Sequence, residues 1–402
     1  MPQYLYHVKN KSGKHLKGKF SAMDKSSAVE ELRKRGLIVL DVSEVRNSVL
    51  SMDIYIGQPV KNIDFVIFCR QFATLIRAGV PLVETVNVLA QQTNSKPLRK
   101  ALLDVAAGLT KGMSFSQAAQ EHKKILPSLF ISMVRSGEES GNLDGTLDRM
   151  AHYYEKAHTT REKIKSAMTY PIVVAVLSIV AVIYLLQGVV PQFVTMFDSF
   201  DAKLPLITKI VLAVSDSISQ QWYIWSAAVI TLVIALLFMR RNERGRYYMD
   251  YAKLKAPIFG KLNQKGAIAQ MTRTLSSLYA SSVPVLQALN IVEEVVGNRV
   301  IGKYIRQSSE SLRQGKSLSE PFKKAWVFPP LVTQMISIGE ETGSLDEMLA
   351  KVADFYEMDV DNTVDRLKSL IEPLLIVFLA GVVGLIVMAI ILPMFTLYSS
   401  VS

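Results

Sequence analysis

The sequence is poor in the residues that disulfides, metal sites and many enzymes need. It has one cysteine, Cys69, and five histidines among 402 residues. A single cysteine excludes a disulfide framework and a zinc site built on cysteine pairs, and the histidines show no spacing typical of metal ligands. Neither a GxSxG nor an HExxH motif occurs. We therefore expect no catalytic residues and no required cofactor.

The chain carries 46 Lys and Arg and 35 Asp and Glu. None of these charged residues occurs in three long stretches, 166–197, 217–239 and 373–402. A helix needs about 20 apolar residues to cross a bilayer. We accordingly predict membrane-spanning helices over 171–190, 222–239 and 373–395. Ion-coupled transporters usually place ionisable groups near the middle of their spans, and none occurs here. A transporter or channel subunit is therefore only the alternative interpretation.

The distribution of Lys and Arg predicts how the spans are oriented. Eleven of these residues flank the span ends on one side, within 151–165, 240–254 and 358–372, against two on the other side. Positive charge is retained in the cytoplasm, so the N-terminus is expected inside and the C-terminus outside. The first residues, MPQYLYHVKNKSGK, have no apolar core, and we expect no cleavable signal peptide. Orientation then explains the net charge of +11 without a nucleic-acid partner.

The chain repeats itself at an offset of 203 residues, which falls to 202 after one indel. Arg70 and Val80-Pro81 recur as Arg273 and Val283-Pro284, and Gly137-Glu-Glu139 recurs as Gly339-Glu-Glu341. The copies cover about 68–193 and 271–395. Because one further span separates them, both copies insert in the same direction, and the repeat is parallel rather than inverted.

Helical periodicity within each copy predicts a mostly α-helical membrane protein. We expect two homologous cytoplasmic bundles of about six helices each, over 62–170 and 240–372. Gly137 and Gly339 are interpreted as helix C-terminal stops. The last helix of each bundle should approach or enter the membrane at Pro171 or Pro373, with a kink there.

Two segments differ from the repeat. Residues 1–57 are predicted to form a small ββαβ module, followed by a tether around Asn47–Lys61. Its expected elements are strands Tyr4–Val8 and His15–Phe20 around a hairpin turn at Asn10–Lys14, a helix Asp24–Arg35, and a strand Leu37–Val45. The external loop 191–221 should contain an interfacial helix over Leu204–Ser219.

Motifs in both copies resemble those of the inner-membrane platform protein of type II secretion and type IV pilus machines, including its competence-pilus relatives. They include Arg70-Gln-Phe-Ala-Thr-Leu75, Gly79-Val-Pro-Leu82, Gly137-Glu-Glu-Ser-Gly-Asn-Leu-Asp144, Tyr170-Pro171, Leu204-Pro-Leu-Ile-Thr208 and Ser337-Ile-Gly-Glu-Glu-Thr-Gly-Ser-Leu-Asp346. The resemblance implies a non-enzymatic scaffold that couples a hexameric cytoplasmic assembly ATPase to insertion of pilin or pseudopilin subunits into a growing fibre. It also implies other inner-membrane assembly proteins, membrane lipids and further copies of the chain as partners.

Acidic residues at helix junctions of the first copy raise the question of a metal. Glu138 and Asn142 are four residues apart, and Glu84 lies one turn into the helix opened by Pro81. Oxygen ligands of this kind suit Ca²⁺, and the resemblance to secretion-branch relatives implies a calcium site at Glu84, Glu138 and Asn142. The alternative is structural: Glu84 complements a helix N-terminus, Asn142 is an N-cap and Glu138 is solvated.

One string resembles a nucleotide-binding loop. Gly297-Asn-Arg-Val-Ile-Gly-Lys303 matches the phosphate loop except that Tyr304 replaces the hydroxyl that should bind Mg²⁺. It also follows a helical segment rather than a strand. We interpret it as a turn between helices, so a membrane-anchored ATPase is disfavoured and nucleotide hydrolysis must come from a partner.

Overall fold

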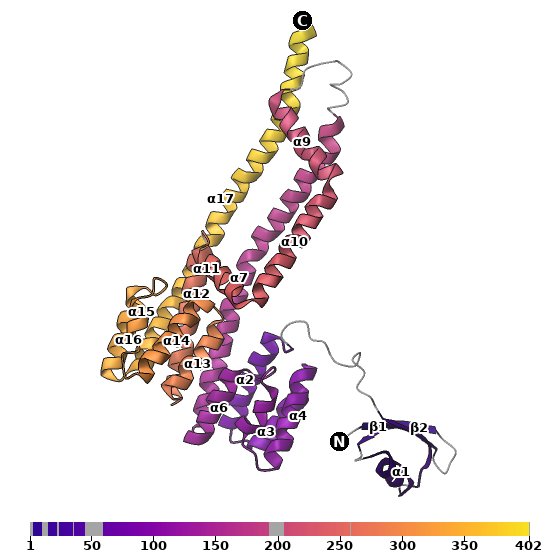
Figure 1. Cartoon of the computed structure of the whole chain (residues 1–402), viewed down its shortest axis with the longest axis vertical. Helices are drawn as coiled ribbons and strands as arrows, with labels where there is room; N and C mark the ends of the chain where they lie inside the picture. The colour runs from indigo at the N-terminus through magenta and orange to yellow at the C-terminus, as the bar shows by residue number, and fades with distance from the viewer. Residues whose placement is uncertain are drawn as a thin grey trace. The chain divides into compact units, whose positions relative to one another are not determined.

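The computed structural model describes residues 3–9, 15–21, 24–34, 36–44, 59–192, 205–257 and 259–401. The chain divides into two compact units, Met1–Pro59 and Val60–Ser402 (Figure 1). The predicted hairpin turn at Asn10–Lys14 and most of the predicted tether lie outside the described residues.

The N-terminal unit has the predicted ββαβ order. Its elements are β1 (Gln3–Lys9), β2 (His15–Ser21), α1 (Lys25–Lys34) and β3 (Ile38–Glu44). The strands form an antiparallel sheet in the order β2-β1-β3, with an irregularity between His7 and Val8. Asp24 begins the helix as predicted, because its carboxylate accepts a hydrogen bond from the Ser27 N–H at 2.7 Å. Val8, Leu32 and Val42 form the small core between helix and sheet.

The second unit is helical and contains both copies of the repeat. The first copy consists of α2 (Asn62–Arg77), α3 (Leu82–Gln92), α4 (Lys96–Thr110), α5 (Phe115–Ala119), the short η2 (Gln120–His122), α6 (Ser128–Ser140) and α7 (Leu143–Tyr184). The π-helical turn η3 (Leu185–Val189) extends α7. Then come α9 (Leu206–Gln220) and α10 (Trp222–Arg241). The second copy consists of α11 (Glu243–Lys255), α12 (Phe259–Ala280), α13 (Val285–Val296), α14 (Arg299–Arg313), α15 (Glu320–Lys323), α16 (Pro330–Thr342) and α17 (Leu345–Val401).

In each copy the last helix of the bundle and the apolar span are one continuous helix. The 42 residues of α7 extend about 60 Å at 1.5 Å per residue, and the 57 residues of α17 extend about 85 Å. Pro171 lies inside α7 and is buried, so the predicted boundary at 170–171 is not a boundary between elements. Both helices run from the bundles along the same direction (Figure 1). The kink at the prolines stays a prediction.

The two bundles are joined more closely than the sequence predicts. One cluster of buried apolar side chains runs from Val60 in the first copy to Tyr356 in the second. Helices α7 and α17 pack against each other, and α7 also contacts α12. The structure thus brings the two predicted domains together over one continuous hydrophobic core.

Within the described residues, three helical segments are long and apolar enough to cross a membrane: Leu143–Gln192, Tyr223–Arg241 and Leu345–Leu392. Only 6%, 0% and 11% of their most apolar windows are buried within the chain, so most of these side chains face lipid or another protein. At one end of the spans, α9 packs on η3 and α17: Thr208 donates a hydrogen bond to the Ala389 carbonyl at 2.8 Å, and Ser215 donates to the Leu186 carbonyl at 2.7 Å. The helix predicted over Leu204–Ser219 thus exists, and its place along the membrane surface stays a prediction.

The interpretation of Gly137 and Gly339 as helix stops is wrong. Helix α6 continues to Ser140 and α16 to Thr342, and the left-handed glycines that end them are Gly141 (φ 71°) and Gly343 (φ 73°). Gly137 and Gly339 instead lie inside their helices and allow the next helix to approach. A Cβ atom on Gly339 would lie 2.8 Å from the Cα atom of Leu345, closer than side chains tolerate.

Substituting Gly339 by alanine is therefore expected to destabilise the chain by about 1–3 kcal/mol through overpacking. Gly266 in α12 is the matched control, since a Cβ atom there meets nothing within 4 Å. Alanine at Gly266 should stabilise by about 0.5–1 kcal/mol, because glycine is a poor helix former. Hydrogen exchange of the α16 and α17 amides measures both. Equal effects of the two substitutions would contradict the close-approach explanation.

Candidate functional site

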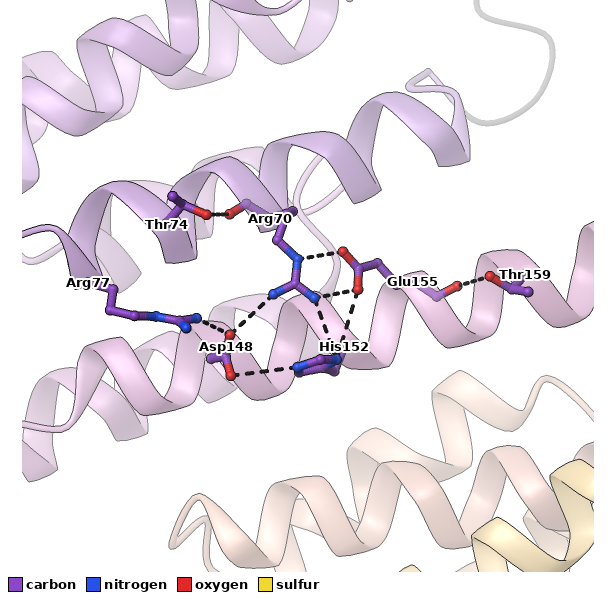
Figure 2. Close-up of polar contacts among 7 residues, drawn as sticks. All are labelled: Arg70, Thr74, Arg77, Asp148, His152, Glu155 and Thr159. Carbon is purple, nitrogen blue, oxygen red and sulfur yellow. Dashed lines mark hydrogen bonds and ion pairs between the residues drawn. The ribbon is translucent and has the colours of Figure 1, made fainter.

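A network of charged side chains joins the first and last helices of the first bundle (Figure 2). Arg70 on α2 donates two hydrogen bonds to the Glu155 carboxylate on α7, one of them from Nε at 2.5 Å. It also donates to Asp148 at 3.2 Å, and Arg77 contacts the same carboxylate. The His152 ring lies between the two acids, 3.5 Å from an Arg70 nitrogen. All five groups are paired with one another, so the network fixes α2 on α7.

The Arg70 hydrogen bond lowers the pKa of Glu155 below its ordinary value. A carboxylate whose pKa is lowered by folding stabilises the folded state above its ordinary pKa, and the contribution disappears as the pH falls through the lowered value. The side chains of Arg70 and Glu155 are 34% and 35% exposed, so solvent screening limits the effect to about 1 kcal/mol. We expect Glu155→Gln to be less stable than the wild type at neutral pH. The two proteins should be equally stable once the pH is below the lowered pKa of Glu155. A difference that persists in acid would contradict this cause.

The second copy repeats the pair in a more buried setting. Arg273 on α12 donates to both oxygens of Glu357 on α17, at 2.8 and 3.0 Å, and also contacts Asp354. The Glu357 side chain is only 11% exposed. Lys156 of the first copy reaches the same carboxylate at 3.5 Å. Glu357 therefore belongs both to its own bundle and to the junction between the copies.

Further polar contacts cross this junction. Tyr153 and Thr274 share a buried hydrogen bond of 3.0 Å, and Lys163 pairs with Asp361 at 2.6 Å. Arg149 donates to the Ser281 hydroxyl at 3.1 Å, and the Ser136 hydroxyl donates to the Ser281 carbonyl. These contacts connect α6 and α7 of the first copy to α12 and α17 of the second.

A cleft of about 830 Å³ opens along the same junction. Its lining includes Lys156, Arg273 and Glu357, whose charges satisfy one another, and the start of α14 at Asn298. We therefore interpret the cleft as part of the interface between the two helical bundles and not as a catalytic site.

The residues predicted to hold calcium occupy three different structural positions. Glu138 on α6 accepts hydrogen bonds from the N–H groups of Phe115 at 2.6 Å and Ser116 at 3.1 Å, and so caps the start of α5. Glu84 lies exposed in the first turn of α3. Asn142 occupies the N-cap position of α7, where its side chain makes no capping hydrogen bond. No group of three or more His, Cys, Asp or Glu side chains that could hold a metal occurs among the described residues.

Glu340 shows what the recurring glutamate does. It accepts hydrogen bonds from the N–H groups of Leu318 at 2.7 Å and Ser319 at 3.4 Å, just as Glu138 does in the first copy. The expectation of a solvated Glu138 is therefore wrong: the first glutamate of each Gly-Glu-Glu motif caps the short helix of its own bundle.

The string that resembles a phosphate loop consists of the turn between α13 and α14, at Gly297 and Asn298, and the first residues of α14. Gly297 ends α13 with φ 63°. The side-chain oxygen Oδ1 of Asn298 accepts hydrogen bonds from the N–H groups of Val300 and Ile301. The Asp250 carboxylate accepts from the Arg299 N–H at 3.1 Å. The N–H groups that would hold a phosphate thus already have partners, and a buried carboxylate sits beside them. The prediction of an inter-helix turn is confirmed.

The two Arg–Glu pairs were not predicted, although the sequence contains a signal for them. Arg70 and Glu155 belong to the positions that recur, as Arg273 and Glu357, at the repeat offset. Residues of opposite charge that recur together in both copies of a duplicated bundle indicate a contact. The contacts across the junction had no such signal, because each is made once.

Comparison with known proteins agrees with the repeat and with the fold. The family described as type II secretion system (T2SS), protein F, matches residues 68–191 and 271–393, which are the two copies. The N-terminal domain of type II secretion system protein F matches residues 1–43.

Full-length relatives come from both branches. The type IV pilus assembly protein PilC of Thermus thermophilus is 39% identical over 100% of both chains. PilC of Myxococcus xanthus is 37% identical over 99% of this chain and 96% of its own length. The type II secretion system protein F of Pseudomonas aeruginosa is 32% identical over 99% of both chains. The chain therefore belongs to the family of type II secretion system protein F and type IV pilus assembly protein PilC, non-enzymatic multi-pass platform proteins of the inner membrane.

Proposed function

We propose that this platform couples a cytoplasmic hexameric assembly ATPase to the insertion of pilin or pseudopilin subunits into a growing fibre. In this proposal the two helical bundles face the cytoplasm, where the ATPase engages them. The spans present the subunits to the fibre within the bilayer. The family membership supports the function, and the names of the relatives leave both pilus assembly and secretion open for this chain.

The continuity of α7 and α17 carries the proposal. Each helix begins in the hydrophobic core of the bundles and continues as a helix into an apolar span. Pro171 and Pro373 each remove one backbone hydrogen bond where the span begins, but the helix does not end there. A displacement of either bundle must therefore move its span. The Arg70–Glu155 and Arg273–Glu357 pairs fix α2 to α7 and α12 to α17, so force applied at α2 or α12 also reaches the membrane.

The spans themselves suit contact with other membrane helices. Their side chains are apolar and hardly buried within the chain, and they carry no ionisable group. Helices associate in lipid through close packing rather than through hydrophobic burial. In this proposal an apolar helix of a subunit docks on them and leaves again without breaking a buried polar contact.

The orientation is tested by labelling intact cells with a membrane-impermeant maleimide. Cysteines replace Glu139 and Glu341, which are exposed at the ends of α6 and α16. We expect them to react only after lysis. Leu206→Cys, at the 73% exposed start of α9, should react with the maleimide in intact cells. Cys69 is buried and should not react. External labelling of either bundle would overturn the proposal, because a cytoplasmic ATPase could not reach it.

The ATPase contact is tested with the full chain, because the shared core makes removal of residues 62–165 a folding defect rather than a binding defect. The assembly ATPase of the same organism should co-purify with the chain from detergent-solubilised membranes. Leu103 on α4 is 48% exposed, so Leu103→Glu leaves the core intact. Co-purification of this variant tests whether the α4 surface contacts the ATPase. Loss of fibre assembly with an intact ATPase contact would place the defect in subunit insertion. No co-purification under any condition would overturn the coupling function.

Calcium binding by Glu84, Glu138 and Asn142 stays a prediction. The hydrogen bonds from Phe115 and Ser116 give Glu138 a structural role, and a bound ion would have to share its oxygens with them. If the prediction holds, calorimetric titration of the full chain shows calcium binding below millimolar concentration, which Glu84→Gln abolishes. Gln287→Glu, at the equivalent position of the second copy, should then strengthen binding there. No heat below millimolar calcium would end the calcium interpretation.

A further inference from the structure

One face of the first copy forms its half of the junction. It is defined by Ser136 on α6 and by Arg149, Tyr153 and Lys156 on α7, and each of these four side chains contacts the second copy. We call these residues the junction face. Its contacts with Ser281, Thr274 and Glu357 are all hydrogen bonds or ion pairs.

The second copy has the same face, and in the described part of the helical unit that face is exposed. At the repeat offset of 202 residues the junction face corresponds to Ile338, Lys351, Phe355 and Met358. Ile338 is 46% exposed, Phe355 48% and Met358 60%. We call these four residues the free face. A junction built as a closed two-fold pair would bury both faces, so the exposure of the second shows that the copies associate head to tail.

Three of the four residues are more apolar on the free face than on the junction face. Serine, tyrosine and lysine on the junction face become isoleucine, phenylalanine and methionine on the free face, and Leu331 on α16 adds a further exposed apolar side chain. Three large apolar side chains gathered on one exposed face of a water-facing bundle indicate an interaction surface.

The surface that the free face would need is also present and exposed. The second copy meets the junction face with Gln270, Thr274 and Ser281 on α12 and its C-terminal turn. At the offset of 203 residues these correspond to Ile67, Gln71 and Ala78 of the first copy. Ile67 is 47% exposed, and Ala78 is exposed as well. Here too the uncovered surface is the more apolar one, with isoleucine for glutamine and alanine for serine.

We propose that the free face docks a second copy of this chain, through the α2 surface around Ile67 and Ala78, in the geometry of the internal junction. The internal contact between Ser136 and Ser281 then corresponds to a contact between Ile338 of one chain and Ala78 of the next. The internal contact between Tyr153 and Thr274 corresponds to a contact of Phe355 with Ile67 and Gln71. The first of these polar contacts within the chain is thus matched by an apolar pair, Ile338 with Ala78, between chains, and Phe355 packs on Ile67 beside Gln71. The result is a head-to-tail assembly in which each copy supplies one face and receives the other.

The membrane favours a second copy over other occupants. Both repeats insert in the same direction, so the operation that relates them keeps every span upright, and applying it again leaves the next copy in the same bilayer. A head-to-tail contact of this kind closes into a ring when the rotation permits. The α2 surface is part of every chain, so a second chain always supplies the counterpart that the free face needs.

Cysteine cross-linking between two differently tagged chains tests the proposal. In a Cys69→Ala background, one chain carries Ile338→Cys and the other Ala78→Cys, and both are co-expressed in membranes. Mild oxidation should give a disulfide-linked heterodimer, while either chain alone should give none. The matched positive control is Ser136→Cys with Ser281→Cys in one chain, which forms an internal disulfide without a dimer. Leu103→Cys, equally exposed on α4, replaces Ala78→Cys as the negative control. Heterodimer no more abundant than with Leu103→Cys would overturn the proposal.

A charge on the free face gives a second, independent measurement. Phe355→Glu should weaken self-association of the full chain in nanodiscs or detergent at least about tenfold, as measured by mass photometry over a dilution series. Folding should not suffer, because the side chain is half exposed. The same substitution at Leu103 should leave self-association unchanged. Unchanged self-association together with loss of ATPase co-purification would assign the free face to the motor and overturn the proposal. Neither result depends on the coupling function.

Discussion

Replacing Arg273 by alanine is expected to cost about 3 kcal/mol of stability, several times the cost of Arg70→Ala. The Glu357 side chain is 11% exposed, and without Arg273 it keeps only Lys156 at 3.5 Å. Removing one partner of a nearly buried ion pair leaves an uncompensated charge, whereas an exposed pair contributes about 1 kcal/mol or less. Arg70 and Glu155 are about one third exposed, so the same substitution in the first copy is the matched control.

Hydrogen exchange of the α12 and α17 amides in the full chain measures this difference. A loss of 3 kcal/mol raises exchange through global opening about a hundredfold, against about fivefold for Arg70→Ala. The double variant Arg273→Met with Glu357→Leu should recover most of the loss, because an apolar pair avoids the desolvation cost. Equal effects of Arg273→Ala and Arg70→Ala would show that burial does not decide the strength of these pairs.

The sequence predicts the parts of the fold that have a strong local signal. The three spans follow from the missing charges, and the duplication follows from glycines, prolines and acids that recur at turns. The strands and the helix of the N-terminal unit follow from alternation and from Asp24 as an N-cap. Each of these features can be recognised in a short window of sequence because its cause acts within that window.

Contacts between distant segments have no such signal. Gly339 is invisible as a packing residue until Leu345 is placed 2.8 Å from its missing side chain, and as a glycine near a helix end it resembles a stop. Glu138 looks like a free ligand until the start of α5 is placed against it. The joint core was missed for the same reason, since a repeat predicts two similar domains but does not say how they pack.

The two copies also show which residues a shared backbone requires. Five buried phenylalanines form the centre of the first bundle, where their rings contact one another; they are Phe65, Phe68, Phe72, Phe115 and Phe130. The equivalent residues of the second copy are aliphatic and also buried, with the exposed fraction below one tenth for each; they are Ile268, Met271, Leu275, Leu318 and Val332. Turn residues and the Arg–Glu pair persist while the core is rebuilt, because a core requires volume and apolarity whereas a turn or an ion pair requires particular atoms.

Phe72→Ala should therefore be the most destabilising of these substitutions, at about 3–5 kcal/mol. The ring is fully buried, lies 5.2 Å from the Phe115 ring and 5.7 Å from the Phe68 ring, and leaves a cavity that the helices cannot close. Because one hydrophobic cluster runs through both copies, we expect hydrogen exchange to rise in α12–α16 as well as in α2–α6. Leu275→Ala, at the equivalent position, should have the reciprocal effect.

The distribution of that exchange decides how the platform responds to force. If both bundles lose protection together, they unfold as one unit, and a push on either is shared by α7 and α17. If Phe72→Ala exposes only α2–α6, the bundles are independent domains that touch at a polar junction, and the common core does not join them mechanically. In that case Lys156→Ala and Lys163→Ala, which break the ion pairs across the junction, should separate the bundles while leaving the protection of each unchanged.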